Sequence, residues 1–237
     1  MFVASPSTST NRTPASYVDA LAVQSISQAG HLLDPVSMTK TTIEFGRDAE
    51  IIAQGCEAEY CFQVVAGCAR TVKLLEDGRR QIGAFLFAGN FFGWETMGEH
   101  EFSVEAVTRV TLRRFRLSAL DDHAASDPAF GQRLRQYIIG QVRVARDHLV
   151  LLGRKTAAER IASFLLEMTE RLPGAGDRVI DVPMSRVDMA DYLGLTIETV
   201  CRGLAELRRQ GTIAVDRSKI VILDRQALGL AGSDRLH

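Results

Sequence analysis

Residues 185–211 read SRVDMADYLGLTIETVCRGLAELRRQG, and this stretch decides how the C-terminal part of the chain folds. Ser185 precedes Asp188 by three residues, a capping pattern that predicts the start of a short helix. Gly194 interrupts the apolar spacing, so we expect the first helix to end there. A second helical pattern follows at once, which leaves room for one tight turn between the two helices.

The second helix is expected over residues 197–210, capped by Thr196 at its start and stopped by Gly211. Its apolar stripe consists of Val200, Leu204 and Leu207. Two apolar runs, residues 212–215 and 219–223, flank a polar turn and predict a small hairpin. Two helices around a glycine turn, followed by a hairpin, predict a winged helix-turn-helix.

In such a motif the second helix enters the major groove of DNA, and its first residues meet base edges. Glu198 and Arg202 are four residues apart and share one face, with Cys201 beside Arg202. Arginine can donate two hydrogen bonds to guanine and glutamate can accept one from cytosine, so we expect these residues to read bases. The alternative is an intrahelical ion pair between Glu198 and Arg202 without any DNA contact.

Polar and basic side chains around this helix are candidates for phosphate contacts, which position a protein on DNA without reading its sequence. They are Thr196, Thr199, Arg208, Arg209, Arg217 and Lys219. The alternative for each basic residue is a solvated surface charge.

After Asp127-Pro128 the apolar spacing changes to threes and fours, which predicts a long amphipathic helix. Its apolar seam consists of Leu134, Ile138, Val142, Ala145, Leu149 and Leu152. A narrow seam over so many turns favours a coiled-coil contact with a second copy of the chain. The alternative is a helix that lies on its own β-domain. A further helix is expected over residues 157–172.

The chain before the long helix consists of two segments that differ in composition. Residues 1–25 are rich in Ser, Thr and Pro and predict a flexible arm. Residues 26–126 contain short apolar runs separated by glycines, with a hairpin turn at residues 76–79, and predict an antiparallel β-roll. We therefore expect an α+β protein with a β-roll, a dimerisation helix over residues 127–154 and a winged helix-turn-helix domain over residues 155–237.

The composition is typical of a globular protein, and its net charge of −1 provides no bulk attraction to nucleic acid, so DNA binding must rest on a local site. The four cysteines do not form a secreted disulfide framework, which favours the cytoplasm. No apolar run reaches the ~20 residues of a membrane span, so we expect no membrane contact. No phosphate-binding loop, nucleophile elbow or HExxH motif indicates an enzyme.

The order of β-roll, long helix and winged helix-turn-helix resembles the CRP/FNR family of bacterial transcription regulators over residues 30–225. Residues 185–213 are similar to the FNR and FixK branch, in which glutamate, a small residue and arginine stand at the positions of Glu198, Cys201 and Arg202. The resemblance implies a homodimer that binds double-stranded DNA at a two-fold symmetric site with TTGA-like half-sites. It also implies that the protein activates transcription by touching RNA polymerase, at genes for low-oxygen respiration or nitrogen-oxide metabolism.

The β-roll lacks the residues with which cyclic-nucleotide-binding members of the family hold the ligand, a Gly-Glu pair and an Arg followed by Ser or Thr. Gly93 is followed by Trp94, Glu95 falls one place late, and the second segment reads Glu101-Phe102-Ser103. Because no cation faces a phosphate there, we expect no cyclic nucleotide and interpret Gly93 and Trp94 as packing residues.

The cysteines and histidines do not follow a spacing known for metal or haem ligands, so we expect no cofactor and no metal site. The spacing of Cys56, Cys61 and Cys68 is not typical of an iron-sulfur cluster. The histidines, each isolated in the sequence, include His31, His100, His123 and His148. Two alternatives stay open, a family member that binds haem or another effector, and a β-roll regulatory subunit that does not bind DNA.

Cys201 is a candidate for redox control because a helix N-terminus and the neighbouring Arg202 both favour the thiolate. Oxidation would add bulk and negative charge against DNA, so we hypothesise that it abolishes binding. The alternative is a small residue that is tolerated where FNR itself has serine.

Overall fold

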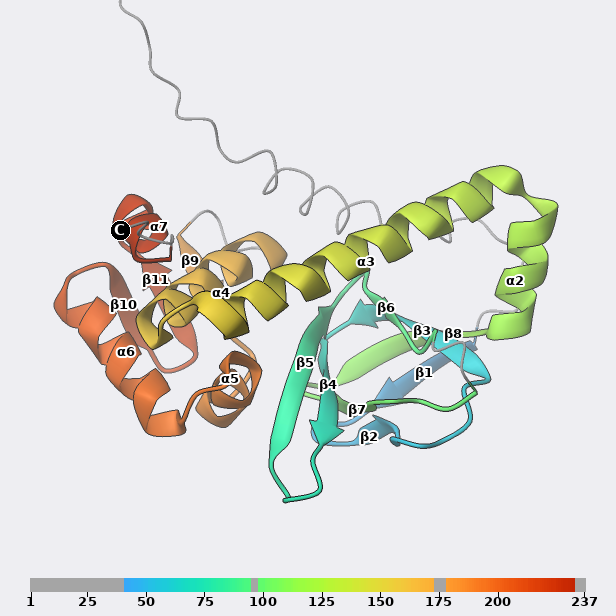
Figure 1. The fold of residues 1–237 in the computed structure, drawn as a ribbon, viewed down its shortest axis with the longest axis horizontal. Coiled ribbons are helices and arrows are strands. Elements are labelled where there is room, and N and C mark those ends of the chain that lie inside the picture. The colour runs from blue at the N-terminus through green and yellow to red at the C-terminus, as the bar shows by residue number, and fades with distance from the viewer. Residues whose placement is uncertain (1–40, 95–97, 173–177, 233–237) are drawn as a thin grey trace, which may run out of the picture.

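The computed structural model describes residues 41–94, 98–172 and 178–232. A β-domain and a smaller, mostly helical domain lie along one long helix, α3 (Figure 1). The expected α+β class, with a β-roll, a long helix and a C-terminal winged helix-turn-helix, is confirmed. The arm expected over residues 1–25 and the position of His31 lie outside the described residues.

Two four-stranded antiparallel sheets form the β-roll. The first contains, in spatial order, β1 (Thr41–Phe45), β8 (Val110–Arg116), β3 (Tyr60–Ala66) and β6 (Phe91–Phe92). The second contains β2 (Glu50–Ile52), β7 (Ser103–Ala106), β4 (Cys68–Leu74) and β5 (Arg80–Phe87). The hairpin predicted at residues 76–79 joins β4 to β5, and Gly78 there has a φ of 82°, which glycine adopts without strain.

The chain leaves the β-roll through α2 (Leu117–Ser126), a helix that the sequence pattern does not indicate, and enters α3 (Pro128–Arg154). The Asp127 carboxylate accepts hydrogen bonds from the backbone N–H groups of Ala129 and Phe130 at 2.9 and 3.1 Å. This cap and the proline in the first turn explain why α3 begins where it does.

One side of α3 packs on the same chain and the other is exposed to solvent. Phe130, Tyr137 and Leu151 are buried against the same chain, and the Tyr137 hydroxyl accepts a hydrogen bond from the Phe91 N–H at 2.9 Å. Leu134 and Leu152, predicted as part of the apolar seam, are half-buried on this side. The other members of the seam are exposed: Ile138, Val142, Ala145 and Leu149. The helix therefore lies on its own β-domain and also presents an apolar stripe to solvent.

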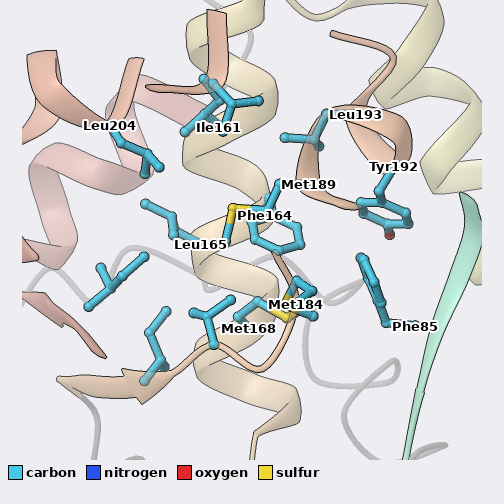
Figure 2. Close-up of a cluster of buried hydrophobic side chains, with 14 of the residues drawn as sticks. Phe85, Ile161, Phe164, Leu165, Met168, Met184, Met189, Tyr192, Leu193 and Leu204 are labelled. Carbon is cyan, nitrogen blue, oxygen red and sulfur yellow. The ribbon is translucent and has the colours of Figure 1, made fainter. Parts of the chain in front are cut away.

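The C-terminal domain contains the winged helix-turn-helix. Its elements are α4 (Ala157–Arg171), β9 (Val179–Asp181), α5 (Arg186–Leu193), α6 (Ile197–Arg209), β10 (Ile213–Asp216), β11 (Lys219–Ile222) and α7 (Arg225–Gly232). Buried side chains of α4 occupy the centre of its core, with Phe164 and Leu165 between α5 and α6 (Figure 2). The predicted hairpin is β10 and β11, whereas β9 and α7 were not predicted.

Candidate nucleic-acid interface

The second helix of the motif, α6, is held by local signals that the sequence contains. The Thr196 hydroxyl caps it by accepting a hydrogen bond from the Thr199 N–H at 3.2 Å, as predicted. Val200, Leu204 and Leu207 are buried and form the predicted stripe against the domain core. The opposite side of α6 is left free for a partner.

The turn before α6 is fixed from two directions. Gly194 adopts the left-handed conformation, with φ 61°, and ends α5 as predicted. The Arg160 guanidinium of α4 donates to the carbonyl oxygens of Leu193, at 2.8 Å, and of Leu152, at 2.7 Å. Arg160 thus ties the turn to the end of α3, a role that the helical spacing of α4 does not indicate.

Glu198, Cys201 and Arg202 are all exposed on the outer side of the first turns of α6. Arg202 Nη2 donates to Thr199 Oγ1 at 3.3 Å, and among the ion pairs of the described residues none joins Arg202 to Glu198. The backbone N–H at the helix start, the Thr196 side chain and the Arg202 charge lower the pKa of Glu198. Glu198 is therefore an ionised acceptor beside a cationic donor, both accessible.

Further cationic groups lie at the end of α6 and on the β10–β11 hairpin. Arg208 and Lys219 are exposed, and Arg217, in the turn of the β10–β11 hairpin, has a positive φ of 54°. Arg209 is exposed but pairs with Glu206, with Nη2 2.7 Å from Oε1. The predicted phosphate candidates thus all lie on α6 or the wing, with Thr196 and Thr199 at the helix start, where their hydroxyl oxygens are 3.1 Å apart.

Arg186, in the first turn of α5, is a neighbour of Cys201 that sequence reasoning missed. Burial lowers the pKa of Arg186, and the Cys201 side chain acts in the opposite direction. One guanidinium nitrogen lies 3.2 Å from the Met189 sulfur. Cys201 therefore has two cationic neighbours, Arg202 next to it on α6 and Arg186 on α5.

The residues that would form a ligand site in the β-roll are engaged in packing. Trp94 packs beside Phe91 and Tyr137, with ring centroids 5.4 and 5.5 Å away. A side chain at Gly93 would meet the Tyr60 carbonyl oxygen at 2.9 Å, and φ there is +84°. The predicted packing role of Gly93 and Trp94 agrees with these contacts, while Glu95 lies outside the described residues.

The cysteines and histidines of the β-roll and α3 are dispersed. Burial raises the pKa of both Cys61 and Cys68 to about 12, which leaves these thiols protonated, and Cys56 is exposed. Within residues 41–94, 98–172 and 178–232, His, Cys, Asp and Glu side chains form no group of three that could hold a metal ion. No helix in these ranges is long and apolar enough to cross a membrane.

Comparison with known proteins agrees with this geometry. Residues 159–230 match the family model of a Crp-like helix-turn-helix domain, and residues 42–127 match that of a cyclic nucleotide-binding domain. The nitrogen fixation regulation protein FixK of Azorhizobium caulinodans is 44% identical over 197 residues, which cover 81% of this chain and 79% of that protein. The transcriptional activator protein FnrL of Cereibacter sphaeroides is 35% identical, with 73% and 72% covered.

Among solved structures, FixK2 from Bradyrhizobium japonicum is 43% identical and superposes with a TM-score of 0.79 over 83% of this chain and 98% of that one. A match to a helix-turn-helix domain over the whole C-terminal lobe argues against a regulatory subunit that does not touch DNA. The chain belongs to the CRP/FNR family of bacterial transcription regulators, in its FixK branch, and is a DNA-binding transcription regulator.

Proposed function

We propose that the protein acts as a homodimer that binds a two-fold symmetric DNA site with TTGA-like half-sites and activates transcription through contact with RNA polymerase. The observation that carries this proposal is the exposure of Glu198, Cys201 and Arg202 together on the outer side of a capped helix in a winged motif. Arg202 donates to guanine and Glu198 accepts from cytosine, while Cys201 occupies the small-residue position between them.

The dimer forms through the exposed stripe of α3. Ile138, Val142, Ala145 and Leu149 follow the alternating four and three spacing of a coiled-coil seam. In a monomer this stripe is a contiguous apolar surface in contact with water, with Ile138 44% exposed, Val142 45% exposed and Leu149 68% exposed. Such a surface is typical of a protein–protein contact. Pairing of two such helices removes it from water and places two copies of α6 in a symmetric arrangement, which requires a symmetric site.

The basic residues at the end of α6 and in the wing position the protein on the phosphates. Arg208, Arg209, Arg217 and Lys219 provide the local positive charge that the net charge of −1 does not provide. Their contacts are independent of base sequence, so they raise affinity for all DNA and orient the reading pair of Glu198 and Arg202.

The target genes are those of low-oxygen respiration or nitrogen-oxide metabolism. The relatives that support this assignment are named for nitrogen fixation regulation and, at 29% identity in Escherichia coli, for fumarate and nitrate reduction regulation. Genome-wide mapping of occupied sites in cells grown with and without oxygen tests it. Occupancy at respiratory promoters is expected, and its absence there would refute the assignment.

Oxidation of Cys201 is a regulatory proposal at the same site. The thiol is exposed at the reading surface, next to Arg202 in the chain and near Arg186 of α5, so oxidation there would add bulk and negative charge against DNA. A Cys201→Ser protein should keep its DNA affinity in peroxide while the parent loses it. Equal loss in both proteins would eliminate the proposal.

The DNA-binding proposal is tested by fluorescence anisotropy with a TTGA palindrome and a scrambled duplex at one fixed salt concentration. The dimer should bind the palindrome at least about 10³-fold more tightly than the scrambled duplex. Comparable affinities for the two duplexes would exclude sequence-specific recognition of this site.

A further inference from the structure

Five charged side chains form a polar contact between the β-roll and the first helix of the helix-turn-helix. We call them the interdomain clamp: Arg70, Arg80 and Glu105 from the β-roll, and Asp188 and Asp191 from α5. Arg70 and Asp188 are only 8% and 3% exposed. The clamp is thus an interdomain contact whose central pair is removed from water.

Asp188 is the centre of the clamp because its two oxygens have different partners. Oδ1 accepts from Arg70 Nη1 at 2.7 Å and from Arg80 Nη2 at 2.8 Å. Oδ2 accepts from the Ser185 N–H at 3.0 Å and from the Ser185 hydroxyl at 2.8 Å, which completes the capping box of α5. One carboxylate therefore both starts the helix and fastens it to the other domain.

The remaining clamp residues hold the two arginines in place. Glu105 Oε2 accepts from Arg70 Nε at 2.9 Å and from Nη2 at 2.6 Å. Asp191 Oδ2 accepts from Arg80 Nε at 2.5 Å, one helical turn after Asp188. Each guanidinium thus joins two carboxylates in a fixed planar geometry, which restricts rotation as well as separation of the domains.

An apolar contact beside the clamp closes the same interface. Phe85 of β5 faces Tyr192 of α5, with ring centroids 5.2 Å apart, and Phe164 of α4 lies next to both (Figure 2). Apolar contacts tolerate small rotations, whereas charge-assisted hydrogen bonds are directional. The clamp therefore restrains the angle between the domains, and the aromatic contact adds apolar burial to the same interface.

The position of α5 determines that of α6, because only the Gly194 turn separates them and Arg160 holds this turn. With the clamp closed, Glu198, Cys201 and Arg202 remain exposed. We infer that Arg70, Arg80 and Asp188 are positioning residues for DNA recognition, which hold the helix-turn-helix on the β-roll in the orientation that binds DNA. This inference rests on the proposed function, since DNA affinity is one of its readouts.

Two variants and a matched control separate positioning from folding. Arg70→Met and Arg80→Met remove the charged tie and leave the Ser185–Asp188 capping box intact. Arg79→Met is the control, because Arg79 is adjacent to Arg80 but pairs with Asp77 inside the β4–β5 turn, at 2.7 Å. Far-ultraviolet circular dichroism and thermal unfolding establish that each variant is folded at the assay temperature.

The orientation itself can be measured with the natural cysteines. Cys56 in the β-roll and Cys201 on α6 are exposed, whereas Cys61 and Cys68 are buried. Nitroxide labels on Cys56 and Cys201 report the interdomain distance by double electron–electron resonance, with labelled chains diluted by an excess of unlabelled Cys56→Ser/Cys201→Ser protein. DNA affinity is measured separately on unlabelled protein, because a label at Cys201 would occupy the reading surface.

We expect a narrow distance distribution in the wild type and in Arg79→Met, and a broad one in Arg70→Met and Arg80→Met. If the binding orientation falls to about a tenth of the population, the apparent Kd for the palindrome rises about tenfold. Distributions as narrow as in the wild type, or palindrome affinities equal to that of Arg79→Met or tighter, would overturn the inference. If the wild type binds the palindrome no more tightly than scrambled DNA, the proposed function is refuted. The interdomain distances would still test the clamp in that case.

Discussion

Arg209 Nη2 donates to both carboxylate oxygens of Glu206, three residues earlier on α6, at 2.7 Å. This hydrogen bond is the main reason why the pKa of Glu206 is lowered and Glu206 stays ionised. Arg208 next to it forms no ion pair with any described residue. In the proposed DNA complex, Arg209 would therefore give up a carboxylate to bind a phosphate, whereas Arg208 would not.

Removing the negative charge from Glu206 should strengthen DNA binding without improving specificity. In Glu206→Gln, Arg209 does not have to break an ion pair before it binds a phosphate. Affinity for cognate and for scrambled DNA should therefore rise by the same factor. The same substitution in an Arg209→Ala background should have little effect. A gain that persists in this background would assign the effect to Glu206 itself.

Arg208→Ala and Arg209→Ala should each weaken binding to cognate and scrambled DNA. Each loss of a phosphate contact should reduce the slope of log affinity against log salt by about 0.9. Anisotropy titrations over a range of salt concentrations provide the slopes. A variant with an unchanged slope does not lose a phosphate contact.

Leu149→Asp should convert the proposed dimer to a monomer, because it places a charge in the exposed stripe of α3. Leu74→Asp is a matched control, since Leu74 is 62% exposed on the β4–β5 hairpin and Leu149 is 68% exposed. Sedimentation velocity distinguishes the two states. A dimeric Leu149→Asp protein would move the interface away from this stripe.

Gly67→Ala should destabilise the β-roll by more than about 2 kcal/mol. Gly67 has a φ of +90°, and a methyl group there would lie 2.2 Å from the Arg109 carbonyl oxygen. Gly46→Ala, where no heavy atom lies within 4 Å, is the control. Chemical denaturation measures both, and equal stabilities would contradict the predicted clash.

His148→Phe should make stability less dependent on pH. The His148 ring stacks on Tyr192 at 4.2 Å, and its burial lowers the pKa; Arg160 acts in the same direction and Glu167 opposes it. The unfolded histidine titrates near about pH 6.5. Below that pH the unfolded chain takes up a proton that the folded one resists, so the wild type loses stability as pH falls through this value.

Phenylalanine keeps the stacking on Tyr192 and cannot titrate. Thermal unfolding of both proteins from about pH 7.5 to about pH 5 compares them across the titration of free histidine. The wild type should lose more stability on acidification than His148→Phe. Parallel curves would show that His148 does not contribute.

The helix-turn-helix could be predicted because its signals are local. The Ser185–Asp188 cap, the Gly194 turn and the Thr196 cap each involve residues within a few positions of one another, and the structure contains all three. The exposure of Glu198 and Arg202 follows from the helical spacing of the buried stripe. Short-range hydrogen bonding and periodicity are therefore sufficient for this part of the site.

Contacts between distant parts of the chain could not be predicted in this way. Arg70 and Asp188 are 118 residues apart, and neither stands in a pattern that indicates the other. On α3, apolar residues lie on two sides, so spacing alone could not separate Tyr137, which packs inside, from Ile138, which is exposed. Tertiary packing decides both cases.

The most direct test of DNA recognition is a set of binding measurements that pairs each reading residue with the half-site. Anisotropy at fixed salt compares wild type, Glu198→Ala and Arg202→Ala on the TTGA palindrome and on palindromes with one base pair of each half-site replaced. Each variant should lose about 1–3 kcal/mol of binding free energy on the cognate site. Each should also discriminate less between the cognate and the replaced base pair at one position of the half-site. Variants that retain the full preference of the wild type would contradict the assignment of Glu198 and Arg202 as base readers.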